Sequence, residues 1–182
     1  TSEIAIEPPD ANLATGDFLW RLSIARIDAD GPFSAFPGVD RTIMLVQGLG
    51  MVLTSTDGTS LFLDRPFVPQ DFPGEWSLDC RLMAGPVRDL NLMVNRSLAR
   101  ARRTVLDVGE APRPLPVAGR GTLLVHGLQG YAKFSGVDAD WAGGALTAGE
   151  TLIAEISAMA APATITGAGT IFAAAIERRD ET

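Results

Sequence analysis

Histidine and cysteine are almost absent from this sequence, which contains one residue of each, His126 and Cys80. A lone cysteine excludes a disulfide within the chain and is typical of a reducing compartment. The acidic start TSEIAIEPPDAN does not resemble a signal peptide, so we expect a cytoplasmic protein. Metal centres built on imidazole need two or three histidines together with a carboxylate. We therefore expect no metal and no cofactor.

An excess of positive charge is also missing, because 15 Lys and Arg face 22 Asp and Glu, a net charge of −7. Such a charge disfavours nonspecific binding to nucleic acid and to anionic lipid. The arginines of segment 96–103 are more typical of a solvated connector. Pro162, Gly167 and Gly169 interrupt the uncharged segment 156–176, which predicts buried strands. We expect neither nucleic acid nor a membrane as a partner.

Common catalytic motifs are absent as well. No serine lies in a G-x-S-x-G turn, and the GLG sequence at 48–50 lacks the lysine of a phosphate loop. His126 ends a predicted strand just before a glycine, where a hydrogen-bonded structural histidine is the more common case than a catalytic base.

Short alternating segments separated by turns dominate the sequence that is present. With 19 Gly and 12 Pro in 182 residues, they predict an all-β protein. The Asp57-Gly58 pair predicts a hairpin. Residues 97–103 predict a short helical or irregular connection, and the Pro- and Gly-rich segment 109–121 predicts a long loop.

The segment 31–41, GPFSAFPGVDR, predicts an ordered loop between two strands. Its Gly-Pro and Pro-Gly pairs restrict the backbone and hold Phe33, Phe36, Asp40 and Arg41 at set positions. Such a loop either lines a ligand site or plugs its rings into the core, and the sequence leaves both readings open.

A short internal repeat indicates two related halves. Residues 45–49 read LVQGL and residues 124–128 read LVHGL, four of five identical at a separation of 79 residues. A duplicated β-domain gives such a repeat, although a common strand-turn sequence also recurs by chance. The predicted domains are residues 1–100 and 101–182.

Several motifs in the first half resemble those of one family. They are WRLSIARIDADGPFSAFPGVDR at 20–41, FPGE at 72–75 and CRLMAGPVRDLNLMVNR at 80–96, and together they resemble the HutD/Ves family. The resemblance implies a cupin-like (RmlC-like), bicupin architecture of two fused small β-barrels. It also implies a setting beside genes for histidine utilisation, and it does not define a reaction.

Alternation gives two predicted strands a polar face. Arg21 and Ser23 share one side of the first strand, and Asp89, Asn91 and Met93 share one side of the second. These faces either line the interior of a barrel or meet solvent. Motif residues of the family fall on the same faces, which favours a pocket. The predicted ligand-binding residues are Arg21, Ser23, Phe33, Ser34, Phe36, Asp89, Asn91 and Met93.

Three functions remain open. The first is a metal-free binding or regulatory protein for a small carboxylate of the urocanate or formylglutamate class, with Arg21 pairing the carboxylate. The second is a metal-free isomerase or hydrolase with Asp89 as general base, and the third is a protein-binding scaffold. A raised pKa of Asp89 would favour the enzyme, and an ion pair with Arg21 would favour binding. Assembly as a homodimer is also left open.

Overall fold

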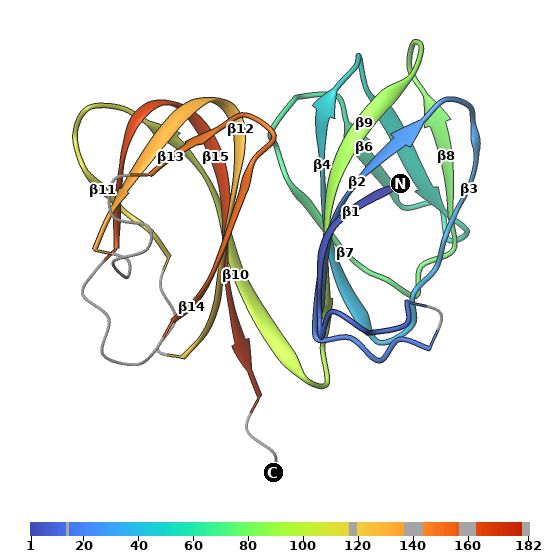
Figure 1. The fold of residues 1–182 in the computed structure, drawn as a ribbon. Coiled ribbons are helices and arrows are strands. Elements are labelled where there is room, and N and C mark those ends of the chain that lie inside the picture. Colours follow the sequence, from blue (N-terminus) through green and yellow to red (C-terminus); the bar gives the residue numbers. More distant parts are fainter. Residues whose placement is uncertain (14, 117–119, 137–143, 157–162, 180–182) are drawn as a thin grey trace. The chain divides into compact units, whose positions relative to one another are not determined.

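The computed structural model describes residues 1–13, 15–116, 120–136, 144–156 and 163–179. These residues form strands and turns without a helix, so the all-β prediction is confirmed (Figure 1). It follows that the described ranges contain no helix suited to crossing a membrane. The chain divides into two compact units, Thr1–Ala99 and Arg100–Thr182.

The first unit consists of a five-stranded and a four-stranded antiparallel sheet. In spatial order, the five-stranded sheet contains β1 (Ser2–Glu7), β2 (Trp20–Ile27), β9 (Val87–Asn95), β4 (Val39–Gln47) and β7 (Gln70–Pro73). The four-stranded sheet contains β3 (Gly31–Phe33), β8 (Leu78–Leu82), β5 (Met51–Ser55) and β6 (Ser60–Leu63). The predicted hairpin at Asp57-Gly58 joins β5 to β6, with Gly58 at a φ of 90°.

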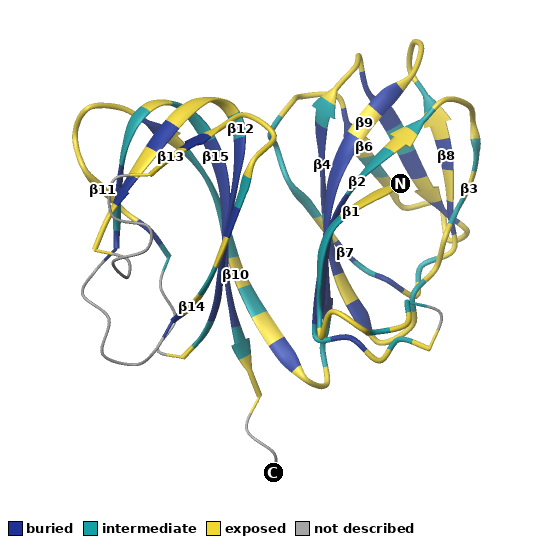
Figure 2. Ribbon diagram, in the orientation of Figure 1, coloured by how far each residue is buried: buried dark blue, intermediate teal, exposed yellow. Residues whose placement is uncertain are grey.

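An apolar core lies between the two sheets of this unit. The five-stranded sheet contributes Ile43, Leu45, Phe72 and Val87, and the four-stranded sheet contributes Met51, Leu53, Leu63, Leu78 and Cys80. Figure 2 shows the burial of β9, the middle strand of the five-stranded sheet, and of its neighbour β4. The sheets therefore pack face to face through alternate side chains.

The second unit contains a six-stranded sheet. Its main order is β10 (Ala99–Val108), β15 (Thr164–Arg178), β12 (Gly121–Ser135) and β13 (Ala145–Thr147), while β11 (Arg113–Pro114) pairs with β15 and β14 (Thr151–Ile156) with β12. Apolar residues of β12, β13, β14 and β15 form its core. The uncharged segment 156–176 is strand from Thr164, as predicted, and residues 157–162 lie outside the described residues.

The sheets of the described residues are not closed into barrels, so the predicted two-barrel bicupin architecture is not shown. Leu45 and Leu124 both lie in strands with a neighbour on each side. However, β4 ends at Gln47, whereas β12 continues past Gly127 with a register shift before Gln129. The two copies of the repeat therefore differ in how the chain leaves the sheet.

The prediction of a helical or irregular connection over 97–103 is wrong, because β10 begins at Ala99. Arg100 and Arg102 are exposed and alternate with less exposed residues, a period of two that the density of charge obscured. Arg100 pairs with Glu177 of β15 at 2.6 Å (Nε–Oε2). The predicted loops are also shorter than expected, since Gly31–Phe33 forms β3 and Arg113–Pro114 forms β11.

Glycines allow β12 and β15 to approach closely over their length, and Figure 1 draws these two long strands alongside each other. Gly130 has a φ of 69° and is paired with Gly169. A Cβ atom on Gly130 would lie 2.0 Å from the carbonyl oxygen of Ala168, and one on Gly169 would lie 2.1 Å from that of Gln129. Backbone atoms cannot give way as flexible side chains do, so both positions require glycine.

We expect Gly130→Ala to lower the free energy of unfolding by at least about 2 kcal/mol, because it adds both a backbone clash and an unfavourable φ. Gly109→Ala is the matched control in the same unit, since a Cβ there meets no atom within 4 Å. Urea unfolding of both variants measures the difference. Equal stabilities of the two variants would contradict this account of the strand pair.

Candidate functional site

A cavity of about 280 Å³ lies in the first unit, lined from β2, β4, β9 and the segment that starts at β3. Seven of the eight predicted site residues line it: Arg21, Ser23, Phe33, Ser34, Phe36, Asn91 and Met93. The eighth, Asp89, is fully buried and does not line it. Residues that the prediction omitted include Arg26 and Arg41.

Strand register explains why these polar residues meet. Arg21 of β2 lies opposite Met93 of β9, and Ser23 lies opposite Asn91. The exposed fractions of Arg21, Ser23 and Asn91 are only 7%, 1% and 6%, so this polar face does not meet bulk solvent. The alternation of the two strands therefore turns their polar side chains toward the interior.

Arg21 is held by three side chains. Its Nε donates to Oε2 of Glu3 in β1 at 2.7 Å, and its Nη1 donates to Oγ of Ser23 at 3.0 Å and lies 3.9 Å from Sδ of Met93. The ion pair considered between Arg21 and Asp89 is not formed, because Glu3 is the partner. In the described part of the chain, Nη2 of Arg21 has no hydrogen-bond partner, and it is not fully buried.

Arg41 is the functional candidate that the sequence prediction left out of the site. Its guanidinium carbon lies 4.9 Å from the ring centre of Phe33, 5.3 Å from that of Phe36 and 4.9 Å from that of Phe72. Its Nη1 donates to the carbonyl oxygen of Ser34 at 2.8 Å. Burial lowers the pKa of Arg41 to about 10, Asp89 acts in the opposite direction, and Arg21 lowers the pKa further.

Only some of the side-chain nitrogens of Arg41 have a hydrogen-bond partner. Its Nε is buried without a hydrogen-bond partner, while Nη2 has no partner within the described ranges and is not fully buried. A signal for this residue was present in the sequence, because Arg41 shares a face of β4 with the buried Ile43 and Leu45. A single charge on an otherwise apolar strand face marks a site that needs an explanation.

Asp89 lies in β9 two residues before Asn91, and it is fully buried. Both of its carboxyl oxygens are buried without a hydrogen-bond partner in the described structure. Burial raises the pKa of Asp89 to about 7, and the nearby Arg41 only partly opposes this shift. A raised pKa is the property that we associated with a general base. Its lack of exposed surface, however, keeps it from direct contact with a molecule in the cavity.

The lining does not fit a metal ion. It contains three arginines and neither a histidine, a cysteine nor a carboxylate, so cations rather than metal ligands surround the space. No group of three or more metal-ligating side chains occurs within the described ranges. His126 belongs to β12 of the second unit, where its Nδ1 is 2.7 Å from Oγ1 of Thr151 and burial lowers its pKa to about 4.

We expect Asp89→Asn to change how stability depends on pH. Because the pKa is about 7 in the folded state and near 3.8 otherwise, only the folded state keeps this proton between these values. The free energy of unfolding of the unaltered protein should therefore fall relative to the variant as pH rises from 4 to 7, by on the order of 4 kcal/mol. Below pH 4 the proton is bound in both states and the difference should level off.

Urea unfolding at several pH values measures this difference, and the effect of other groups such as His126 cancels between the two proteins. Asp79→Asn, at an exposed position in β8, is the control for loss of one carboxylate. The same pH dependence in both variants would show that burial does not govern the proton of Asp89.

Comparison with known proteins shows which family this chain resembles. The family model described as HutD matches residues 1–173. An uncharacterized 21.2 kDa protein in the hutC 3′ region of Pseudomonas putida is 42% identical over 96 residues, 51% of this chain and 48% of its own length. Protein Ves of Citrobacter koseri is 39% identical over 108 residues, 59% of this chain and 54% of its own. The chain thus spans about half the length of the curated relatives it matches.

Solved structures agree with this match. The structure of HutD from Pseudomonas fluorescens SBW25 (formate condition) has a TM-score of 0.78 at 31% identity, with 94% of this chain and 85% of that chain covered. A cupin 2 conserved barrel domain protein from Leptotrichia buccalis has a TM-score of 0.56 at 11% identity, covering 87% and 84%, and shows that the fold is cupin-like. On its motifs, its fold and the match over 1–173, the chain belongs to the HutD family.

Proposed function

We propose that the cavity binds a small molecule that carries a carboxylate, and that the protein works by binding it. The proposal rests on one observation. Arg21 and Arg41 line the same cavity, and the lining contains no carboxylate. Burial is the main cause of the lowered pKa of Arg41, and the neighbouring cation Arg21 lowers this pKa further. An anion between them would offset that repulsion in a protein whose net charge is otherwise negative.

The hydrogen-bond inventory supports the same ligand. Glu3 and Ser23 fix Arg21, and the main chain at Ser34 fixes Arg41. Each guanidinium then retains Nη2 as a donor without a partner in the described structure. Pre-positioned guanidinium donors are well suited to carboxylate oxygens, and the fixed arginines lose little freedom on binding.

The remaining lining suits a small, partly apolar body. Phe33 and Phe36 offer apolar surface, and Ser23 and Asn91 offer polar groups for the rest of the ligand. A volume of about 280 Å³ is close to the lower end of ligand pockets, which favours a metabolite over a large cofactor.

The setting of the relatives narrows the chemical class within this proposal. One relative lies in a hutC 3′ region, and the family model is HutD. We therefore include urocanate and N-formylglutamate among the candidate ligands, and an accessory or regulatory role in histidine utilisation. A cytoplasmic setting belongs to the same proposal and rests on the single cysteine.

A second candidate is a metal-free isomerase or hydrolase with Asp89 as general base. The raised pKa of Asp89, about 7, favours it, because a base is most effective near the working pH. The full burial of Asp89 counts against this second candidate, since a base must come within hydrogen-bond reach of the proton it removes. Binding without turnover is therefore the better-supported function.

Arg41→Ala should weaken binding of a carboxylate probe about 10- to 100-fold, the loss expected for one hydrogen bond to a charged group. The probes are urocanate, N-formylglutamate and simple dicarboxylates, measured by isothermal titration calorimetry. Arg65→Ala removes an exposed arginine from the same unit and should leave affinity unchanged. Leu90→Ala, at a buried position, should cost about 2–5 kcal/mol of stability without altering ligand choice.

Arg41→Lys keeps the charge and guards against misfolding of the alanine variant. It should fold and still bind the carboxylate more weakly, because an ammonium lacks the planar pair of donors. Failure of every carboxylate to bind at millimolar concentration, or equal affinities in Arg41→Lys and Arg65→Ala, would contradict the proposed site.

The second candidate is tested by turnover. Each probe is incubated with the protein and followed by NMR, and we expect no conversion beyond that in buffer. Asp89→Asn should still bind the probes, at least as tightly as the unaltered protein, because Asp89 does not line the cavity and the change removes a negative charge near Arg41. Conversion that disappears in Asp89→Asn while binding persists would establish the enzyme instead.

A further inference from the structure

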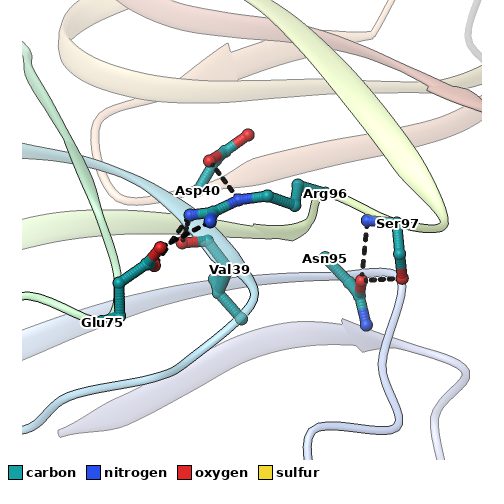
Figure 3. Close-up of polar contacts among 6 residues, drawn as sticks. All are labelled: Val39, Asp40, Glu75, Asn95, Arg96 and Ser97. Atoms are coloured by element: carbon teal, nitrogen blue, oxygen red, sulfur yellow. Dashed lines mark hydrogen bonds and ion pairs between the residues drawn. The ribbon is translucent and has the colours of Figure 1, made fainter.

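Arg96, the residue that follows β9, joins three separate parts of the first unit (Figure 3). Its Nη1 and Nη2 donate to the two carboxylate oxygens of Glu75 at 2.6 and 2.8 Å. Its Nε donates to Oδ1 of Asp40 at 2.9 Å, and Nη2 also donates to the carbonyl oxygen of Val39 at 3.0 Å. The main-chain N–H of Arg96 donates to the carbonyl oxygen of Gly38 at 3.0 Å.

The partners of Arg96 follow two copies of one tripeptide. Phe-Pro-Gly occurs at 36–38 and again at 72–74, and the two copies are hydrogen-bonded to each other. The N–H of Phe36 donates to the carbonyl oxygen of Gly74 at 2.6 Å, and the N–H of Gly74 donates to that of Val39 at 2.7 Å. A Cβ on Gly74 would lie 2.5 Å from the carbonyl oxygen of Phe36, so this close approach requires glycine. We call these two segments the FPG turns, the second of which starts at the end of β7.

The phenylalanine of each FPG turn packs on the same cation. The ring centres of Phe36 and Phe72 lie 5.3 and 4.9 Å from the guanidinium carbon of Arg41. The relative position of the FPG turns therefore determines where two of the three rings around this cation lie. Arg96 bonds to residues just beyond both turns and does not line the cavity.

We propose that Arg96 is a positioning residue of the pocket: its bridge from Asp40 to Glu75 holds the FPG turns in the register that places Phe36 and Phe72 on Arg41. The consequence for ligand affinity rests on the proposed function, whereas the effect on the surroundings of Arg41 does not. Two-pronged pairing with Glu75 fixes orientation as well as distance. An exposed ion pair contributes little to stability, so the bridge acts mainly through geometry.

The experiment compares Arg96→Gln and Glu75→Gln with the control Arg65→Gln, which alters an exposed arginine next to Asp64. Without ligand, NMR follows the Nε–H resonance of Arg41, identified by its loss in Arg41→Lys. Aromatic rings shift the resonance of a proton held close to them, so movement of either FPG turn changes its position. With ligand, calorimetry gives the affinity for urocanate and for N-formylglutamate.

We expect the Arg41 resonance to move in both Arg96→Gln and Glu75→Gln and to stay in place in Arg65→Gln. Affinity for a carboxylate that binds the unaltered protein should fall about 5- to 10-fold in the first two variants. The melting temperature should fall by no more than about 2–4 °C, as for loss of an exposed ion pair. Arg96→Lys should not restore the resonance, because an ammonium cannot pair with Glu75 in two-pronged fashion.

The outcomes separate the two proposals. An unmoved Arg41 resonance in Arg96→Gln overturns the positioning role, whatever the affinities are. If the resonance moves but the affinity for a probe that binds is unchanged, Arg96 does not position the pocket for its ligand, and the proposal is also overturned. If no carboxylate binds the unaltered protein, the proposed function fails, and a moved resonance still supports the role of Arg96 in placing the rings.

Discussion

Burial of the Arg41 guanidinium is the constraint around which the first unit is arranged. A cation removed from water is costly unless its faces and its hydrogens find partners. Here Phe33, Phe36 and Phe72 supply three ring faces, and Ser34 supplies a carbonyl oxygen. These groups come from β3, from the segment after it and from β7. Segments that are far apart in sequence are thus positioned about one side chain.

The inward-facing residues of this unit change from apolar to polar along β4 and from polar to apolar along β9. On β4 the inward residues run from Leu45 through Ile43 to Arg41, and on β9 they run from Asp89 through Asn91 to Met93. Leu45 faces the apolar core, whereas Arg41 lines the cavity. The antiparallel register places Arg21 and Arg41 on the two sides of Met93 at one end of the sheet, whereas Asp89 lies beside Leu45. The cavity lies where Arg21 and Arg41 come together with Asn91 and Met93.

Much of this arrangement follows from local sequence, and the rest depends on pairing between distant strands. Alternation was sufficient to group Arg21 with Ser23 and Asp89 with Asn91, since parity on a strand is local, and the family motifs were needed to favour the interior for both faces. Alternation could not give Arg41 its role, because the rings that surround its guanidinium come from β3, from the segment after it and from β7. Alternation also could not show whether the sheets close into barrels, because strand order and stagger are properties of the whole sheet. The strand at Ala99 was missed because arginines hid its alternation.

The buried Asp89 would couple anion binding at the two arginines to pH. Its carboxyl group has a pKa of about 7 and lies close enough to Arg41 for each to influence the other. An anion bound at the arginines would screen that favourable charge and raise the pKa of Asp89 further. Binding at neutral pH would then be accompanied by proton uptake, and by linkage the affinity for an anion would increase as the medium becomes more acidic. The measured heat of binding would accordingly depend on the ionisation enthalpy of the buffer.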